Sequence, residues 1–118
     1  MKRIAAFLIM FVFAAAISTA YAHPPSDIKI TFNAETKILQ AVIIHNASNP
    51  INHYIKTVDI GLNGKRIIEQ IISRQDNNES QTVSYFIPDV KDGDVLSVDG
   101  YCSISGNLKK EITVRLEK

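Results

Sequence analysis

From residue 27 onward, apolar residues recur at every second position in short runs that turn-forming residues separate. This period of two is typical of strands, whose successive side chains point to opposite faces of a sheet, whereas a helix repeats about every 3.6 residues. The pattern predicts seven strands, at residues 27–33, 38–45, 53–62, 65–73, 81–87, 95–104 and 110–116. Asn63-Gly64 predicts a type I′ hairpin, because both central residues of that turn need positive φ angles. We therefore expect an all-β fold, a seven-stranded antiparallel sandwich or barrel of the immunoglobulin type.

The first 22 residues depart from this pattern. The basic pair Lys2-Arg3 precedes an uncharged apolar run at residues 4–17, and Ala20-Tyr21-Ala22 matches the small-x-small sequence that signal peptidase cleaves. The run is too short for a membrane anchor, because a spanning helix needs about 20 apolar residues. We expect residues 1–22 to be a signal peptide, the protein to be periplasmic or secreted, and residues 23–118 to form one domain without a membrane partner.

Charge and cysteine content narrow the classes of partner and site. The chain has 13 Lys plus Arg against 12 Asp plus Glu, a formal charge of +1. Loss of residues 1–22 removes two bases and no acid, so the formal charge becomes −1. This balance does not favour nucleic acid as a partner. Cys102 is the only cysteine, so its thiol cannot pair within the chain and is free, metal-bound or shared with another molecule.

Four residues of metal-binding type lie near predicted strand ends. His45 ends the second strand and His53 opens the third, so the two should flank one connection at one end of the sandwich. Cys102 lies late in the sixth strand, and His23 lies just ahead of the first, at the predicted mature N-terminus. Imidazole and thiolate are ligands that suit iron, copper and zinc. These residues form a candidate metal site if the topology also brings Cys102 and His23 to that end.

Each of these residues also has a simpler interpretation. A histidine at a strand end is commonly a hydrogen-bonding cap or a surface residue. Cys102 shares one face of its strand with Leu96 and Val98, which fits a small buried hydrophobic residue. An α-amino group beside an imidazole can chelate copper, so His23 by itself is a candidate copper ligand.

Two short segments resemble one known family. HNASNPINHYI, which begins at His45, resembles the loop of the superoxide reductase and desulfoferrodoxin iron domain, where a His-Pro pair is followed by His-Tyr-Ile or His-His-Ile. GYCSISG, which contains Cys102, resembles that family's Tyr-Cys-Asn-x-His-Gly segment. The resemblance implies a seven-stranded immunoglobulin-like domain, a mononuclear ferrous iron held by four histidines and one cysteine, and the reduction of superoxide to peroxide with electrons from a donor protein.

Carried over residue by residue, the resemblance assigns His53 to the His-Tyr-Ile histidine and Cys102 to the axial cysteine. His45 matches the His-Pro histidine if this loop is two residues longer than is usual in the family. A rival alignment places Asn49-Pro50 on His-Pro and leaves that ligand missing. His23 stands where the family has its first histidine, although the surrounding residues do not match.

Two departures from the family pattern weaken the expectation of catalysis. Ser105 occupies the position of the fourth histidine, and serine is a poor ligand for ferrous iron. The family has an acid and a lysine in the loop before the second histidine, where this chain has Asn52 and no charged residue. Lys56 follows closely, but a lysine on a strand edge is more simply a solubilising residue. The alternatives to an iron protein are a copper or other metal-binding protein without turnover, and an immunoglobulin-like interaction module.

Overall fold

The computed structural model describes residues 23–116, and the predicted signal peptide lies outside them. The described residues form seven strands. In chain order these are β1 (Asp27–Asn33), β2 (Ile38–Ile44), β3 (Ile55–Leu62), β4 (Lys65–Ile71), β5 (Ser80–Phe86), β6 (Val95–Cys102) and β7 (Asn107–Thr113). Within this part of the chain, no helix is long and apolar enough to cross a membrane.

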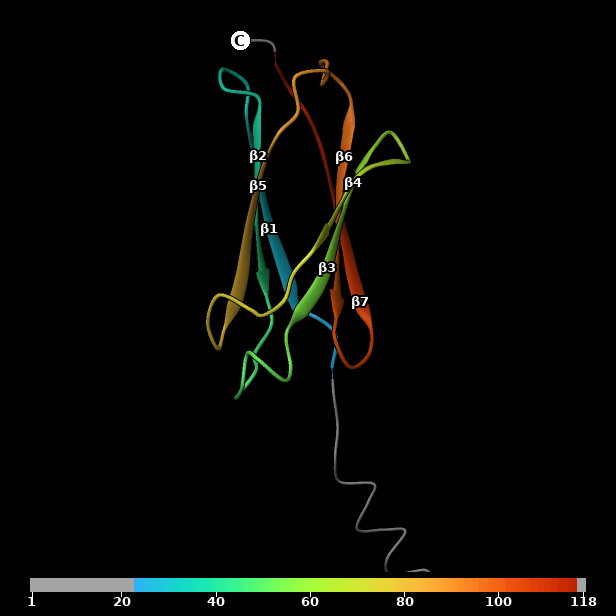
Figure 1. Ribbon diagram of the computed structural model, residues 1–118. Coiled ribbons are helices and arrows are strands. Elements are labelled where there is room, and N and C mark those ends of the chain that lie inside the picture. Colours follow the sequence, from blue (N-terminus) through green and yellow to red (C-terminus); the bar gives the residue numbers. More distant parts are fainter. Residues whose placement is uncertain (1–22, 117–118) are drawn as a thin grey trace, which may run out of the picture.

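The strands form two antiparallel sheets that face each other, so the fold is a sandwich rather than one closed barrel (Figure 1). One sheet has the strand order β1-β2-β5, and the other has the order β4-β3-β6-β7. The chain passes from one sheet to the other between β2 and β3, between β4 and β5, and between β5 and β6, which is the kind of crossing found in immunoglobulin-like sandwiches. The predicted all-β, seven-stranded antiparallel fold is confirmed.

The core lies between the sheets and is built from alternate residues of the strands. Because successive side chains of a strand point to opposite faces, one set from each strand turns inward and the other faces solvent. The inward side chains with at most 4% exposure include Ile28, Leu39, Ala41, Ile43, Val58, Ile60, Val83, Leu96 and Val98. Burying one large aliphatic side chain of this kind stabilises a fold by roughly 1.5–3 kcal/mol.

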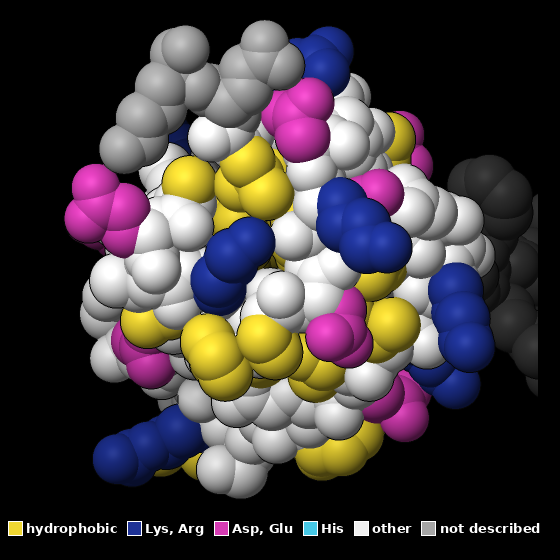
Figure 2. Space-filling model, turned by 90° about the horizontal axis from the view of Figure 1, so that it is seen from above, with side chains coloured by type: hydrophobic (Ala, Val, Ile, Leu, Met, Phe, Trp, Pro, Cys, Tyr) yellow, Lys and Arg dark blue, Asp and Glu magenta, His cyan; other side chains and the backbone are white. Residues whose placement is uncertain are grey.

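The antiparallel pairing gathers alternate strand ends at one end of the sandwich, which we call the site end. Asp27 at the start of β1 pairs with Ile44 at the end of β2, and Ile55 near the start of β3 pairs with Cys102 at the end of β6. This end is at the bottom of Figure 1. Figure 2 shows the opposite end, where apolar side chains lie among acidic and basic ones and no histidine of the described residues is visible.

The Asn63-Gly64 hairpin is confirmed by the positive φ angles of 52° and 86° at its two central residues. Six strands begin and end within two residues of their predicted bounds, but the seventh was predicted at 110–116 and is Asn107–Thr113. The reason is a tight turn before it, closed by a 3.0 Å hydrogen bond from Cys102 N to Gly106 O. Pairing therefore resumes at once, over a stretch in which Leu108 is the one apolar residue before Ile112, too sparse for the apolar alternation to reveal.

Candidate metal site

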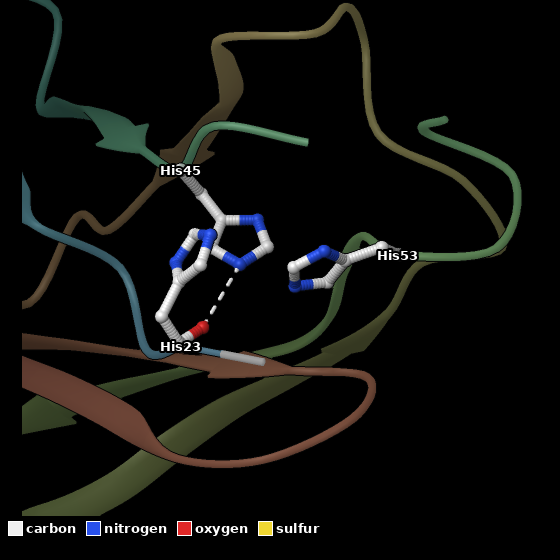
Figure 3. A group of neighbouring side chains, drawn as sticks. All are labelled: His23, His45 and His53. Atoms are coloured by element: carbon white, nitrogen blue, oxygen red, sulfur yellow. Dashed lines mark hydrogen bonds between the residues drawn. The ribbon is translucent and has the colours of Figure 1, made fainter. Parts of the chain in front are cut away.

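Three imidazoles converge at the site end from three separate points of the chain. His23 precedes β1, His45 directly follows β2, and His53 lies two residues ahead of β3. One ring nitrogen from each residue lies within 4.8 Å of the others. The ring centroids are 4.6 Å apart for His45 and His53, and 5.0 Å apart for each pair with His23 (Figure 3). This group could hold a metal ion.

His45 is the deepest of the three, with no exposed surface. Its backbone N–H donates to Glu79 O at 2.8 Å, which prolongs the pairing of β2 with the segment leading into β5. Its Nδ1 lies 2.8 Å from Gln75 Oε1, and its Nε2 lies 3.2 Å from the carbonyl oxygen of His23. A fully buried imidazole needs such partners, because burying an unpaired polar group costs about 1–3 kcal/mol. A neutral imidazole has a single N–H, so His45 donates to one of these two oxygens at a time, and the contact with Gln75 is the shorter.

A compact turn directs His53 toward the same point. Asn49 Oδ1 accepts from Ile51 N at 3.1 Å, and Asn49 O accepts from His53 N at 2.9 Å. Asparagine favours turns because its side chain can bond to the backbone two residues on. The next residue is tied to the end of β6, since Tyr54 N donates to Ser103 Oγ at 3.1 Å and Ser103 N donates to Tyr54 O at 2.8 Å. These contacts place His53 beside the end of β6.

His23 reaches the site because the segment after it lies close to the turn between β6 and β7. Pro25 is buried, and Pro24 lies against Gly106. A Cβ atom added to Gly106 would come within 2.9 Å of Pro24 Cβ, closer than real Cβ contacts allow. Gly106 also has a φ of 82°, a conformation that costs other residues free energy. This glycine is therefore required both for the turn and for the approach of the His23 segment.

Cys102 is 4% exposed, and its sulfur contacts one member of the histidine group, His53. Its Sγ lies 3.1 Å from His53 Nε2 and accepts a 3.4 Å hydrogen bond from Ile104 N. Cys102 is buried, as its interpretation as a small hydrophobic residue predicted. That interpretation does not account for the contact with His53. The topology has brought both Cys102 and His23 to the end that carries His45 and His53.

Two of the candidate ligand atoms, Cys102 Sγ and His53 Nε2, already have the separation expected of ligands of one ion. Bonds of about 2.3 Å to sulfur and about 2.1 Å to nitrogen at a right angle separate the two ligand atoms by about 3.1 Å. The separation of Cys102 Sγ from His53 Nε2 is 3.1 Å. Two nitrogens on opposite sides of one ion are about 4.2 Å apart, and the three imidazole nitrogens lie within 4.8 Å of one another. The three rings would have to move inward to reach bonding distance of a common ion. The donor set fits iron, copper or zinc.

The electrostatics favour neutral, ligating imidazole. Burial lowers the pKa of His53, and the charges of His45 and His23 lower it further. A histidine whose pKa is lowered carries a lone pair at neutral pH, as a metal ligand must. The proximity of the rings itself therefore favours a form that can bind a cation.

An open pocket of about 580 Å³ adjoins two of the histidines. Its lining residues are His23, Asn46, Ala47, Ser48, His53, Asn78 and Glu79. Glu79 is the only Asp, Glu, Lys or Arg among these described residues. Lys56 and Ser105 are both exposed and do not line this pocket. The charge at the opening is therefore acidic, which attracts cations rather than anions.

Three residues of the site were missed at the level of sequence: Gln75, Glu79 and Ser103. Gln75 and Glu79 belong to the polar run between β4 and β5, whose composition is that of a solvated loop. Ser103 lies beside Cys102, but a serine after a strand carries no signal of its own. Their roles arise from contacts with segments 20 or more residues away, and a local pattern does not contain that information.

No protein-family model matches this chain, and no curated protein matches it significantly. The site is therefore interpreted from its own residues and geometry.

Proposed function

We propose that this protein binds a single metal ion through His23, His45, His53 and Cys102, and that the metal is iron. The observation that carries the proposal is the 3.1 Å contact between His53 Nε2 and Cys102 Sγ, two residues 49 positions apart, beside two further imidazoles. A mixed imidazole and thiolate set suits a redox-active metal. The resemblance of HNASNPINHYI and GYCSISG to superoxide reductase segments is the reason for choosing iron over zinc.

The residues of the chain would define the surroundings of the ion. His45 and Cys102 form the buried side of the site, while His23 and His53 border the open pocket. The N–H of Ile104, which points at the sulfur, stabilises negative charge on a thiolate. When bound, ferrous iron supplies the electron that superoxide needs to become peroxide, and a donor protein must return that electron.

We propose that any reduction of superoxide by this protein is slow. The chain has three histidines, so one ligand of the family pattern is missing. Glu79 is the charged residue at the pocket, and its carboxylate repels an anionic substrate instead of steering it inward. We expect a rate constant with superoxide well below the diffusion limit, measurable by stopped-flow mixing of the reduced protein. A rate no greater than that of the metal-free protein would reduce the proposal to metal binding alone.

Metal analysis of the natively exported protein, before any affinity step, tests the binding itself. We expect about one iron per chain and, after oxidation, a visible thiolate-to-iron absorption band. Cys102→Ala should abolish the band. Ser97→Ala, a small change in a buried residue of the same strand, should leave the band unchanged. Protein without bound metal, or a band that persists in Cys102→Ala, would contradict the proposal.

Copper binding without turnover is the second candidate, and the acidic pocket beside His23 favours it. If the signal peptide is cleaved before His23, the α-amino group and the imidazole of this residue together form a copper chelate. Copper uptake should then disappear when one alanine is inserted ahead of His23, and it should survive Cys102→Ala. Iron binding, in contrast, is expected to be lost or weakened in Cys102→Ala.

A further inference from the structure

Gln75 lies in the connection between β4 and β5, yet it is only 2% exposed. Its side-chain NH₂ donates to two backbone carbonyls, those of His45 at 2.7 Å and Asn77 at 2.9 Å. Its Oε1 accepts from Ile55 N at 3.2 Å and lies 2.8 Å from His45 Nδ1. Both donors and both acceptor positions of the amide are thus in use.

These contacts determine which way the amide of Gln75 points. A carbonyl oxygen can only accept, so the NH₂ must face the carbonyls of His45 and Asn77, and Oε1 must face the imidazole. An oxygen at 2.8 Å requires a proton on His45 Nδ1. A neutral imidazole with that proton carries its lone pair on Nε2. Figure 3 shows this nitrogen among the three imidazoles, 3.2 Å from the carbonyl oxygen of His23. That oxygen can only accept, so it competes with Gln75 Oε1 for the single proton of a neutral His45, and it must move aside when Nε2 binds a metal ion. The 2.8 Å contact to Gln75 is the shorter of the two and favours the proton on Nδ1.

We propose that Gln75 is a positioning residue that holds His45 in the Nδ1-protonated tautomer and so presents the Nε2 lone pair to a metal ion. The role in metal binding rests on the proposed function, whereas the tautomer can be observed without metal. Ligating histidines commonly donate their second N–H to a buried acceptor, and loss of that acceptor typically weakens metal binding 10–100-fold. Gln75 also bridges His45 to Ile55, the two ends of the β2–β3 connection that contains His53.

Two substitutions of Gln75 distinguish the effect of its acceptor oxygen from the effect of its side-chain size. Gln75→Met keeps an unbranched side chain of similar length but removes the hydrogen bonds of the amide, including the one to His45 Nδ1, and leaves the His23 carbonyl beside Nε2 as the remaining acceptor. Gln75→Glu keeps an oxygen facing His45 Nδ1 and loses the two donors. Gln81→Met is the matched control, because Gln81 is also buried, at 6% exposure, and bonds the backbone of Asp76 and Thr82 without touching a histidine.

The experiment uses protein purified after expression of the full chain, free of metal, at about pH 8, where imidazole is largely neutral. Long-range proton–nitrogen correlation spectra report the His45 tautomer, and titration with Zn²⁺ as a redox-inert probe reports affinity. We expect the Nδ1–H form in the unmodified protein, Gln81→Met and Gln75→Glu, and a shift toward Nε2–H in Gln75→Met. Zn²⁺ affinity should fall 10–100-fold in Gln75→Met and change less than about threefold in Gln81→Met.

An Nε2–H tautomer in the unmodified protein overturns the inference even if Gln75→Met fails to fold. Unchanged tautomer and affinity in a folded Gln75→Met do the same. If the tautomer follows Gln75 but no protein binds Zn²⁺, the assignment of the tautomer is confirmed and the metal site is the part that fails.

Discussion

Two residues at the site end, Gly106 and Asn49, help to place the histidines without being ligands themselves. Gly106 contributes no side chain, yet the absence of a Cβ lets Pro24 lie against the β6–β7 turn and carries His23 into the group. Asn49 acts in a similar way by closing the turn that directs His53. Neither residue would be chosen as part of a metal site by its chemistry.

Gly106→Ala should both destabilise the fold and displace His23. A positive φ costs a non-glycine residue about 1 kcal/mol, and the new Cβ would also meet Pro24. Gly93→Ala is the matched control, since Gly93 has a φ of 87° with nothing within 4 Å of an added Cβ. Urea unfolding should show a larger loss for Gly106→Ala than for Gly93→Ala, and only Gly106→Ala should weaken metal binding. Equal effects of the two substitutions would contradict the role assigned to Pro24.

Pairs of strands from different sheets are joined at both edges of the sandwich by polar contacts. At one edge, Lys110 Nζ of β7 lies 2.9 Å from Asp27 Oδ1 of β1. At the other edge, the Tyr85 hydroxyl of β5 donates to Gln70 Oε1 of β4 at 2.5 Å. Burial raises the pKa of Tyr85 to about 12. Since β1 begins at Asp27, four residues after His23, the Asp27–Lys110 edge also helps to place the first ligand.

The Asp27–Lys110 pair predicts a dependence of stability on pH. The hydrogen bond from Lys110 lowers the pKa of Asp27, and the N–H of Ile28 lowers it further. A carboxyl group with a lowered folded pKa stabilises the fold above its unfolded pKa of about 3.9, and this contribution is lost as the pH falls through the folded pKa. Lys110→Met should raise the pKa of Asp27, measured by carbon-detected titration. Lys109→Met, one position away, should leave it unchanged, and a rise there would contradict the assignment.

The whole molecule places two candidate ligands on each sheet. His23 and His45 flank strands of the β1-β2-β5 sheet, whereas His53 lies two residues ahead of β3 and Cys102 ends β6, both strands of the β4-β3-β6-β7 sheet. A metal ion shared by all four would therefore join the two sheets at the site end. The metal ion would bind the folded state and not the unfolded chain, in which the ligands are far apart. Metal binding should therefore raise the free energy of unfolding.

Removal of metal should therefore lower the unfolding temperature. Metal at a concentration 100 times its dissociation constant stabilises a fold by about 2.7 kcal/mol, which corresponds to roughly 10 °C or more for a domain of this size. Scanning calorimetry with and without a chelator measures the difference, and Cys102→Ala should reduce it. Identical unfolding temperatures with and without chelator would support an interaction module without metal.

Much of the fold was predictable because strand formation depends on local alternation. Six strands and the Asn63-Gly64 hairpin were predicted from the sequence, because the alternation of apolar and polar residues within a strand shows which of its faces is buried. The seventh strand was misplaced because three of its first four residues are polar. His45 and His53 were expected at one connection and lie there, although that connection joins two sheets rather than two paired neighbours.

Residue types and their order along the chain were sufficient to identify an all-β domain and four side chains able to bind a metal. The tertiary structure alone decided that Cys102 and His23 reach the end that holds His45 and His53, and that Gln75 is buried against an imidazole. The physical reason is that alternation reports burial within one segment, whereas convergence depends on strand pairing and sheet packing between residues up to 83 positions apart.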